Sequence, residues 1–472
     1  MSQQLTGETT ELLQAMIRNA CVNDGTPDSG EEIRNADLLT SFLEGSGLDI
    51  QRFESHPGRA SVVARIEGSD PNAPKLCLMG HTDVVPVSPE GWDNDPFGGE
   101  LIDGEVWGRG AIDMLNLTSS MAVAFRHLAD SGFTPTGDLI YFGVADEEAG
   151  GTWGAEWMFE HHADVIDADY VLTELGGWSS IDQHGHRKIT INVGEKGIAW
   201  RKLRVRGTPG HGSMPWGSDN ALVKAAEAVR RLASFRPATQ ITDIWRGQVD
   251  AMHISEEEKA VLLDPQQVWD ALDAMPVGAA RACHALTHTT ISPNVIHPVE
   301  SQKTNVIPDV VDLVVDIRTL PGTTEAEVIA MITEALGDLA PHVEIGEAEQ
   351  QAEGTQSSID TPLWDVISHQ TQIAYPGAEL LPGLVVGGTD ARFYRHCGCT
   401  VPSWPKTPIK PGESAAAKVL QARIEGTPLE ALCGFVWVPS RDPKQLPVCQ
   451  QCKEIYDMFK IFNDGLRDTP NE

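Results

Sequence analysis

Four short segments of the chain place a histidine and several carboxylates where metal ions could bind. They are GHTD (80–83), GRGAID (108–113), DEE (146–148) and TEL (173–175). Each of them follows an apolar run typical of a β-strand, for example residues 75–79 before His81. Because groups at the carboxyl ends of neighbouring strands in an open α/β sheet converge on one crevice, these segments could meet in space. The set predicts an active site built around divalent metal ions.

The residue types fit zinc-dependent hydrolysis. Zinc accepts imidazole and carboxylate ligands, and two zinc ions about 3.5 to 4 Å apart can share a carboxylate and lower the pKa of a bound water. Asp113, after a glycine-rich turn, is a candidate bridge. Consecutive side chains on extended backbone point in opposite directions, so we expect Glu148 to bind metal and Glu147 to act as general base. His81 and Asp83 share one face of a strand, so Asp83 can orient the imidazole.

Each motif taken alone also has an ordinary structural explanation. A His-x-Asp sequence is common in surface turns, and two adjacent glutamates usually lie on a solvated face. Asp113 could cap the helix expected after it, and Glu174 could be a buried, ion-paired acid. Four such motifs at successive strand ends favour a shared metal site over four separate explanations.

The composition narrows the class of partner. The formal charge of −33 disfavours nucleic acid and anionic membranes, which would repel this surface, so small molecules are expected. No apolar run approaches the roughly eighteen residues of a membrane span, and the first twenty residues are typical of an amphipathic helix, not a signal peptide. A cytoplasmic address is therefore expected. The eight cysteines should then be thiols, metal ligands or packing residues.

Length and pattern predict more than one domain. At roughly 150 residues per domain, 472 residues suggest two or three. Strand and helix patterns alternate from about residue 8 to 195, which predicts an α/β catalytic domain whose mixed sheet is flanked by helices. The expected strands are 60–66, 75–80, 138–145 and 169–174, and a helix is expected at 114–131.

Near 189–206 the pattern changes to the apolar–polar alternation of half-exposed antiparallel strands. We therefore expect a smaller α+β lid and dimerisation domain inserted into the first, with a charged, less regular stretch at 235–282. Prolines at 402, 405, 408 and 411 indicate a linker. The expected segments are 1–196 and 353–401 for the catalytic domain, 197–352 for the lid, and 402–472 for the linker and Cys-rich tail.

The ordered motifs resemble the M20 metallopeptidase family, which holds aminoacylases, carboxypeptidases, dipeptidases and diaminopimelate desuccinylases. The resemblance covers about residues 8–401. It rests on GHTDVVP (80–86), GRGAIDM (108–114), ADEEAGG (145–151), TEL (173–175), HGSMP (211–215), NVIP (305–308), DIRTLPG (316–322) and GGTDAR (387–392). It implies a dizinc catalytic domain with a lid that mediates homodimer formation. His81 and Glu174 would bind one zinc, Glu148 the other and Asp113 both, with Glu147 as the base.

The resemblance also implies residues that hold the substrate. His211 would reach across the dimer to stabilise the oxyanion, although a histidine between two glycines could equally be a turn residue. Asn305 and Arg318 match lid positions that bind substrate. Arg392 matches a position that grips a substrate carboxylate, which suits its planar bidentate fork. Without the family, both arginines would more often be read as surface ion pairs.

The chain departs from the family beyond GGTDAR. The family continues to a terminal histidine that completes the second zinc site, whereas no histidine follows His396 here. The zinc held by Glu148 and Asp113 would then lack its third protein ligand. Cys397 and Cys399 could substitute in principle, but they fall too early in the chain.

The tail carries a metal-binding pattern of its own. Cys433 is followed by Cys449-x-x-Cys452, a spacing typical of zinc knuckles, although only three donors are visible. Residues 413–460 resemble a small bacterial domain family of unknown function. Both resemblances break at about 401–413, which suggests a fusion or reading-frame product. A natural tail with free thiols is the alternative.

These observations predict a hydrolase that cleaves an amide bond next to a free carboxylate, in an N-acyl amino acid or a short peptide. Zinc is the expected metal, and cobalt or manganese could replace it, because carboxylate and imidazole ligands accept several metals. Two other functions stay open. One is an impaired or non-catalytic relative that binds a single zinc, and the other is a zinc-dependent interaction module formed by the tail.

Overall fold

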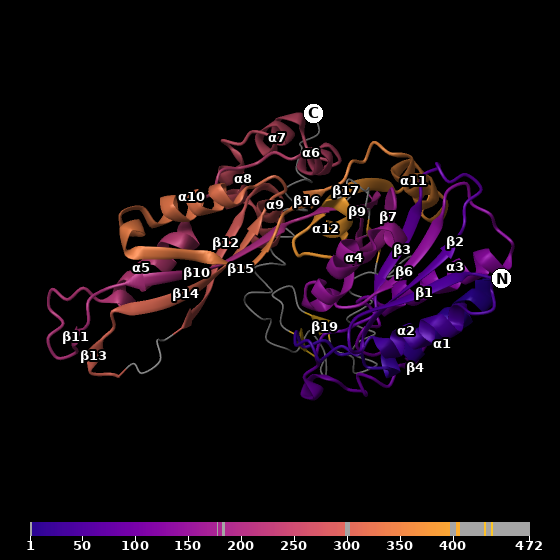
Figure 1. Cartoon of the computed structure of the whole chain (residues 1–472). Helices are drawn as coiled ribbons and strands as arrows, with labels where there is room; N and C mark the ends of the chain where they lie inside the picture. Colours follow the sequence, from indigo (N-terminus) through magenta and orange to yellow (C-terminus); the bar gives the residue numbers. More distant parts are fainter. Residues whose placement is uncertain are drawn as a thin grey trace, which may run out of the picture. The chain divides into compact units, whose positions relative to one another are not determined.

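The structure is a computed structural model that describes residues 2–176, 178–181, 185–297 and 303–396, with short segments at 403–405, 429–430 and 436–437. Contacts between residues divide the chain into two compact units. The first spans Met1–Ser180, Arg187–Arg236 and Thr289–Thr407, and the second includes Ile181–His186 and Pro237–His288. Figure 1 shows the course of the chain. Among the described helices, none combines the length and hydrophobicity needed to cross a membrane. The expected domain limits at 196, 352 and 401 stay predictions.

The first unit contains a ten-stranded mixed sheet, as the sequence predicted. Its strand order is β1-β2-β6-β3-β7-β18-β9-β16, and β8 and β17 also pair with β9. The strands are β1 (Asp49–His56), β2 (Arg59–Ile66), β3 (Leu76–His81), β6 (Leu139–Val144), β7 (Tyr170–Gly176), β8 (Trp178–Ile181), β9 (Arg187–Glu195), β16 (Thr355–Gln356), β17 (Glu379–Val385) and β18 (Ser403–Pro405). Strand β3 pairs in parallel with both β6 and β7. The carboxyl ends of these three strands therefore meet at one edge.

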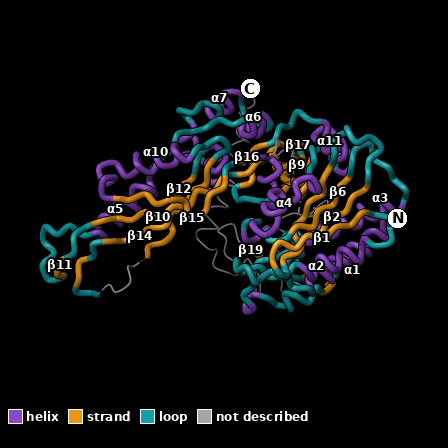
Figure 2. Tube along the Cα trace, viewed as in Figure 1, coloured by secondary structure: helices purple, strands orange, loops and turns teal. Residues whose placement is uncertain are grey.

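Helices cover both faces of this sheet, because its central strands are apolar on both sides. Val62 and Tyr141 are buried in a core that includes residues of α1 (Ser2–Arg18), α2 (Ile33–Leu43) and α3 (Leu115–Asp130). Their neighbours along the strands, Val63 and Phe142, are buried in another core with residues of α4 (Trp157–Ile166) and α12 (Ala391–His396). Figure 2 shows the strands in orange between the purple helices. With both faces covered, the strand ends are the part of the sheet that remains open.

The same unit contains a separate four-stranded antiparallel sheet. Its order is β12-β14-β10-β15, with bounds Thr290–His297, Val310–Thr319, Gly197–Arg206 and Val343–Ala352. Alternate residues of β14 are buried against α5 (Ala221–Ser234) and α10 (Glu325–Leu336). This strict alternation is the period of two of a strand with one buried face. The remaining elements of the unit are β4 (Glu100–Ile102), β5 (Glu105–Trp107), β11 (Gly210–His211), β13 (Val306–Ile307) and α11 (Pro362–Ala374).

Two expectations about this unit were wrong. Residues 188–193 were expected to form a half-exposed antiparallel strand. Instead, β9 pairs in parallel with β17 along most of its length and antiparallel with β16 and β18 only over one or two residues, and Ile189 and Ile191 are buried against α11. The alternation of apolar and polar residues in 188–193 indicated that one face of the strand is apolar. It did not indicate which of the two sheets the strand would join. The proline-rich stretch after 401 was expected to be a linker, yet β18 lies in it and pairs with β7 and β9. Proline is tolerated there because this strand is only three residues long and pairs irregularly.

Residues 237–288 of the second unit are mainly helical, although 235–282 was expected to be less regular. Its helices are α6 (Asp243–Asp250), α7 (Glu256–Leu262), α8 (Val268–Ala274) and α9 (Val277–Thr287). The buried indole of Trp245 lies in their core and donates a hydrogen bond to the Leu262 carbonyl at 2.8 Å. Short helices with local caps at Thr242 and Ser255 leave only a weak periodic signal in the sequence. The backbone of β19 (Leu429–Glu430) pairs with that of β20 (Val436–Trp437).

The start of α10 gives a test of local stability. Thr324 and Glu327 form a capping box, in which the Thr324 hydroxyl accepts from the Glu327 backbone N–H and the Glu327 carboxylate accepts from the Thr324 backbone N–H. Thr324→Ala is expected to lower the free energy of unfolding by about 1 kcal/mol. Urea denaturation followed by circular dichroism measures it. Thr333→Ala, an exposed threonine within the same helix, is the control and should cost little. Equal midpoints for the two variants would contradict the prediction.

Candidate metal centre

The predicted ligands come from four places around one edge of the ten-stranded sheet. His81 ends β3, Glu174 lies in β7, and the glutamate pair follows β6. Asp113 lies two residues before α3 begins at Leu115. The parallel pairing of β3 with β6 and β7 places these positions side by side, which is how residues far apart in sequence reach one site.

Three of the predicted ligands converge closely. His81 Nε2 lies 3.3 Å from Asp113 Oδ1 and 3.8 Å from Glu174 Oε2. One potential ligand atom from each of the three residues lies within 4.8 Å of the others. The side chains of His81 and Glu174 are buried, whereas 49% of the Asp113 side chain is exposed. A nitrogen and two carboxylate oxygens at this spacing fit a zinc ion with an open position toward solvent.

The ring of His81 is held in the orientation that a metal ligand needs. Its Nδ1 lies 2.9 Å from the Asp83 backbone carbonyl and 3.5 Å from the Asp83 carboxylate. Because the carbonyl can only accept, Nδ1 carries the hydrogen and Nε2 faces the carboxylates. Asp83 therefore contacts the ring more closely through its main chain than through the side chain that the sequence suggested.

The charges of the cluster favour a bound cation. Burial alone would lower the pKa of His81, but its hydrogen bonds with Asp113 and Asp83 and the nearby Glu174 and Glu147 raise that pKa well above its usual value. A proton on Nε2 would lie among these carboxylates. A divalent cation would satisfy the same carboxylates and displace that proton.

Glu147 and Glu148 lie in a 3₁₀ turn, not on the extended backbone from which their different roles were inferred. Burial raises the pKa of Glu148 to about 7. Burial and the nearby Glu174 raise the pKa of Glu147 well above its usual range. Like charges crowded at low dielectric hold protons in this way. The assignment of Glu147 as base and Glu148 as metal ligand stays a prediction. The rule for extended backbone does not support it, because both residues lie in a turn.

A cleft of about 1400 Å³ opens beside this turn. Its lining includes Glu147, Glu148, Trp200, Arg318 and Arg392. The cleft thus brings the candidate base and two guanidinium groups to one space. The lining also includes the acidic residues Asp24, Glu156 and Glu353, so the two arginines are local positive groups in a largely acidic cleft.

Both arginines of the cleft have partners within the protein. Arg392 donates to the backbone carbonyls of Thr389 at 2.9 Å and Gly150 at 2.6 Å. Arg318 donates to Asp316 Oδ1 at 2.8 Å, and its guanidinium lies 5.5 Å from the ring centre of Trp200. These contacts hold each guanidinium group in a fixed direction. The binding of a substrate by Arg318 and Arg392 is still a prediction.

The other predicted residues lie elsewhere in the fold. His211 is exposed in β11, with its Nδ1 2.7 Å from the Ser213 hydroxyl. Asn305 is exposed beside it, and its carbonyl accepts from the Gly212 N–H at 2.8 Å. Neither is among the residues that line the cleft. The tail cysteines Cys433, Cys449 and Cys452, and also Cys397 and Cys399, fall outside the described residues.

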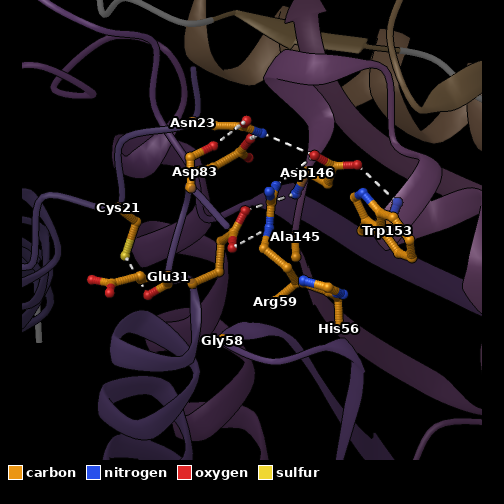
Figure 3. Close-up of polar contacts among 12 residues, drawn as sticks. Cys21, Asn23, Glu31, His56, Gly58, Arg59, Asp83, Ala145, Asp146 and Trp153 are labelled. Carbon is orange, nitrogen blue, oxygen red and sulfur yellow. Dashed lines mark hydrogen bonds and ion pairs between the residues drawn. The ribbon is translucent and has the colours of Figure 1, made fainter. Parts of the chain in front are cut away.

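The sequence did not reveal several groups that surround the centre. Asp390 is buried and, within the described chain, neither of its carboxylate oxygens has a hydrogen-bond partner. Burial raises its pKa to about 8. It lies in the GGTDAR motif, which was the only signal available. The buried side chains of Asn23, Arg59 and Asp146 form a polar network next to Asp83 (Figure 3).

The family model described as peptidase family M20/M25/M40 matches residues 77–424, well over half of the chain. The chain belongs to this family. A second model, a protein of unknown function (DUF3039), matches residues 415–459 and confirms the resemblance expected for the tail. Membership of the M20 family, whose enzymes are generally metal-dependent hydrolases of amide and peptide bonds, agrees with the ligand cluster at the sheet edge.

Curated M20 relatives cover much of the chain. The chain is 26% identical over 406 residues to the N-fatty-acyl-amino acid synthase/hydrolase PM20D1.1 of Danio rerio, which spans 83% of this chain and 77% of that protein. It is 33% identical over 247 residues to the succinyl-diaminopimelate desuccinylase of Gluconacetobacter diazotrophicus, covering 50% of this chain and 60% of the relative.

Solved M20 structures share the fold. The metallo-carboxypeptidase Sso-CP2 of Sulfolobus solfataricus matches with a TM-score of 0.63 and 18% identity over 84% of this chain and 90% of its own. Human carnosine dipeptidase 1 matches with a TM-score of 0.57 and 17% identity over 85% and 90%. Two such matches confirm the M20 fold, with a mixed sheet in the catalytic part and a smaller second sheet.

The ligand cluster predicts which aspartate of the α3 region binds metal. Asp113→Asn keeps the size of the side chain but replaces a charged ligand oxygen with an amide. It is expected to weaken zinc binding by at least about tenfold, measured by calorimetric titration. Asp130→Asn, at the opposite end of α3 and exposed, should bind zinc as the parent protein does. Equal zinc affinity in the two variants would remove Asp113 from the site.

Proposed function

We propose that this chain is a zinc-dependent hydrolase that cleaves the amide bond of an N-acyl amino acid or a short peptide, next to a free carboxylate. The convergence of His81, Asp113 and Glu174 beside a cleft that contains Glu147 carries this proposal. The relatives support the N-acyl class, since their names describe fatty-acyl and succinyl amides of amino acids. Cobalt or manganese could serve in place of zinc.

The residues of the site would divide the work. A divalent cation held by His81, Asp113 and Glu174 would supply a water of lowered pKa and polarise the substrate carbonyl. Glu147 would accept the proton of the attacking water and pass it to the leaving amine. Burial and the nearby Glu174 raise its pKa, and a raised pKa makes a carboxylate a stronger base toward the proton of the water. Arg318 and Arg392 would attract the substrate carboxylate.

One observation favours a weaker alternative. Among the described residues, a single group of three side chains could hold an ion, and the second site would depend on Glu148, Asp113 and a histidine that the sequence lacks. An M20 relative with one zinc and impaired activity is therefore the second candidate function. Counting zinc per chain in the purified protein separates the two. Deleting the tail would also remove β18 from the sheet, so a truncated chain is unsuitable for this zinc count. The double variant Cys449→Ser, Cys452→Ser tests instead whether the tail binds a zinc ion of its own.

The proposed setting is a cytoplasmic homodimer that acts on small molecules, without nucleic acid or membrane partners. The helix α5 and the edge strand β12 carry exposed apolar side chains that a second copy could cover, namely Leu222, Val223, Val295 and Ile296. In such a dimer His211 would act in the partner's cleft, which agrees with its exposed position.

The candidate base gives a direct test of the mechanism. Glu147→Gln removes the proton acceptor, and kcat for N-acetyl and N-succinyl amino acids is expected to fall by about 10²- to 10⁴-fold. Zinc content, measured by plasma emission spectrometry, should stay unchanged. Glu160→Gln, exposed on α4, is the matched control and should keep full activity. Activity retained by Glu147→Gln would rule out Glu147 as the base.

The proposed dimer predicts the effect of a charge on α5. Val223→Glu would place a carboxylate in an apolar contact between two copies, and burying an unpaired charge is costly. We expect this variant to sediment as a monomer in analytical ultracentrifugation. Val366→Glu, a similarly exposed valine on α11, should sediment like the parent protein. A parent protein that is itself monomeric would contradict the proposal.

A further inference from the structure

Asn23 is buried beside Asp83, at the wall of the cleft and in the connection between α1 and α2. Only 3% of it is exposed. Its backbone N–H donates to the Val84 carbonyl at 2.8 Å, and the Val84 N–H donates to the Cys21 carbonyl at 2.9 Å. The connection therefore runs alongside the residues that follow β3, and the position of the Asn23 backbone is fixed next to Asp83.

The direction of the Asn23 amide follows from its partners. Its Oδ1 accepts from the Gly25 N–H at 3.0 Å and lies 3.3 Å from the Ser29 hydroxyl. A backbone N–H can only donate, so the oxygen must face the loop and the NH₂ must face the other way. That NH₂ donates to Asp83 Oδ2 at 2.8 Å and to Asp146 Oδ1 at 2.9 Å (Figure 3). One neutral group thus joins two buried carboxylates.

Each of these carboxylates supports a different part of the centre. Asp83 accepts from the Glu148 backbone N–H at 3.1 Å, and its carbonyl lies against the ring of His81. Asp146 directly precedes Glu147 and has a left-handed backbone, with φ at 67°. Its carboxylate also accepts from the Trp153 N–H at 2.8 Å and from Arg59. The direct bond from the Glu148 N–H to Asp83 is one link between the histidine side and the glutamate turn, and the amide of Asn23 adds a second through Asp146.

We propose that Asn23 is a positioning residue that sets the distance between the His81 side of the metal centre and the turn that carries Glu147 and Glu148. Without its donors, the carboxylates of Asp83 and Asp146 would repel each other across a buried space. A lysine or arginine at this position could also join them, but its charge would oppose a nearby metal ion. A neutral amide supplies two hydrogens at no such cost. This role rests on the proposed metal-dependent hydrolysis.

Asn23→Asp is the informative substitution, because it keeps the size and the oxygen that faces Gly25 and removes both donors. We expect it to weaken zinc binding about 10- to 100-fold, which is typical when a group that orients ligands is lost. The visible absorption spectrum of the cobalt-substituted protein should shift, since it reports coordination geometry. At saturating zinc, kcat for N-acetyl amino acids should fall more than KM rises. Asn23→Ser, which keeps one donor, should fall between Asn23→Asp and the parent protein.

Two controls separate positioning from loss of stability. Ser29→Ala removes the hydroxyl on the oxygen side of the amide and leaves the NH₂ in place, so its cobalt spectrum should match the parent. Arg65→Met breaks an arginine–aspartate pair with Asp138 at the far end of β2, whereas Arg59 lies at its start. It should lower the melting temperature without changing zinc affinity.

The outcomes are distinct. If Asn23→Asp matches the parent protein in zinc affinity and cobalt spectrum, the positioning role is wrong while the proposed function stands. The same holds if Arg65→Met at an equal melting temperature reproduces the losses of Asn23→Asp. If the parent protein binds no zinc and hydrolyses no N-acetyl or N-succinyl amino acid, the proposed function fails and the positioning role fails with it.

Discussion

The structure depends on holding several carboxylates together at one edge of a buried sheet. Glu147, Glu148 and Glu174 lie around His81, and burial with mutual repulsion raises the pKa of the first two. Repulsion of this kind would drive the site apart unless positive charge compensates it. Protons compensate in part, and a divalent cation would do so more completely. Crowding these carboxylates costs free energy while the site is empty. The same crowding gives the site its affinity for a metal cation.

The sheet supplies the rigidity that such a site requires. Parallel strands β6, β3 and β7 end side by side, and apolar residues on both faces are buried under helices. Ligands on strand ends move less than ligands on free loops, since the strands are fixed by packing on two sides. Around them, backbone carbonyls and neutral donors set the orientation of the side chains. Glu195 shows the same principle, because its carboxylate accepts from the backbone and hydroxyl of Thr389 and fixes the GGTD turn.

Several features of this fold could be read from local patterns. The apolar–polar alternation at 199–206 predicted β10, and the apolar runs before His81 and Asp146 predicted β3 and β6. Adjacent motifs at strand ends gave the ligand set, because the geometry of parallel strands requires their ends to meet. These signals are local in the chain, so the sequence by itself determined the class of fold, the candidate ligands and the kind of chemistry.

Only the tertiary structure decided how these parts are joined. Alternation in 188–193 did not reveal that β9 pairs in parallel with β17, and the prolines after 401 did not reveal β18. Glu147 and Glu148 were separated in role by a rule for extended strands, whereas they lie in a turn. Asn23 and Asp146 are 123 residues apart, and no pattern in either segment points to the other. A local pattern records which side of an element is apolar, but the partner that covers it is chosen by packing across the whole chain.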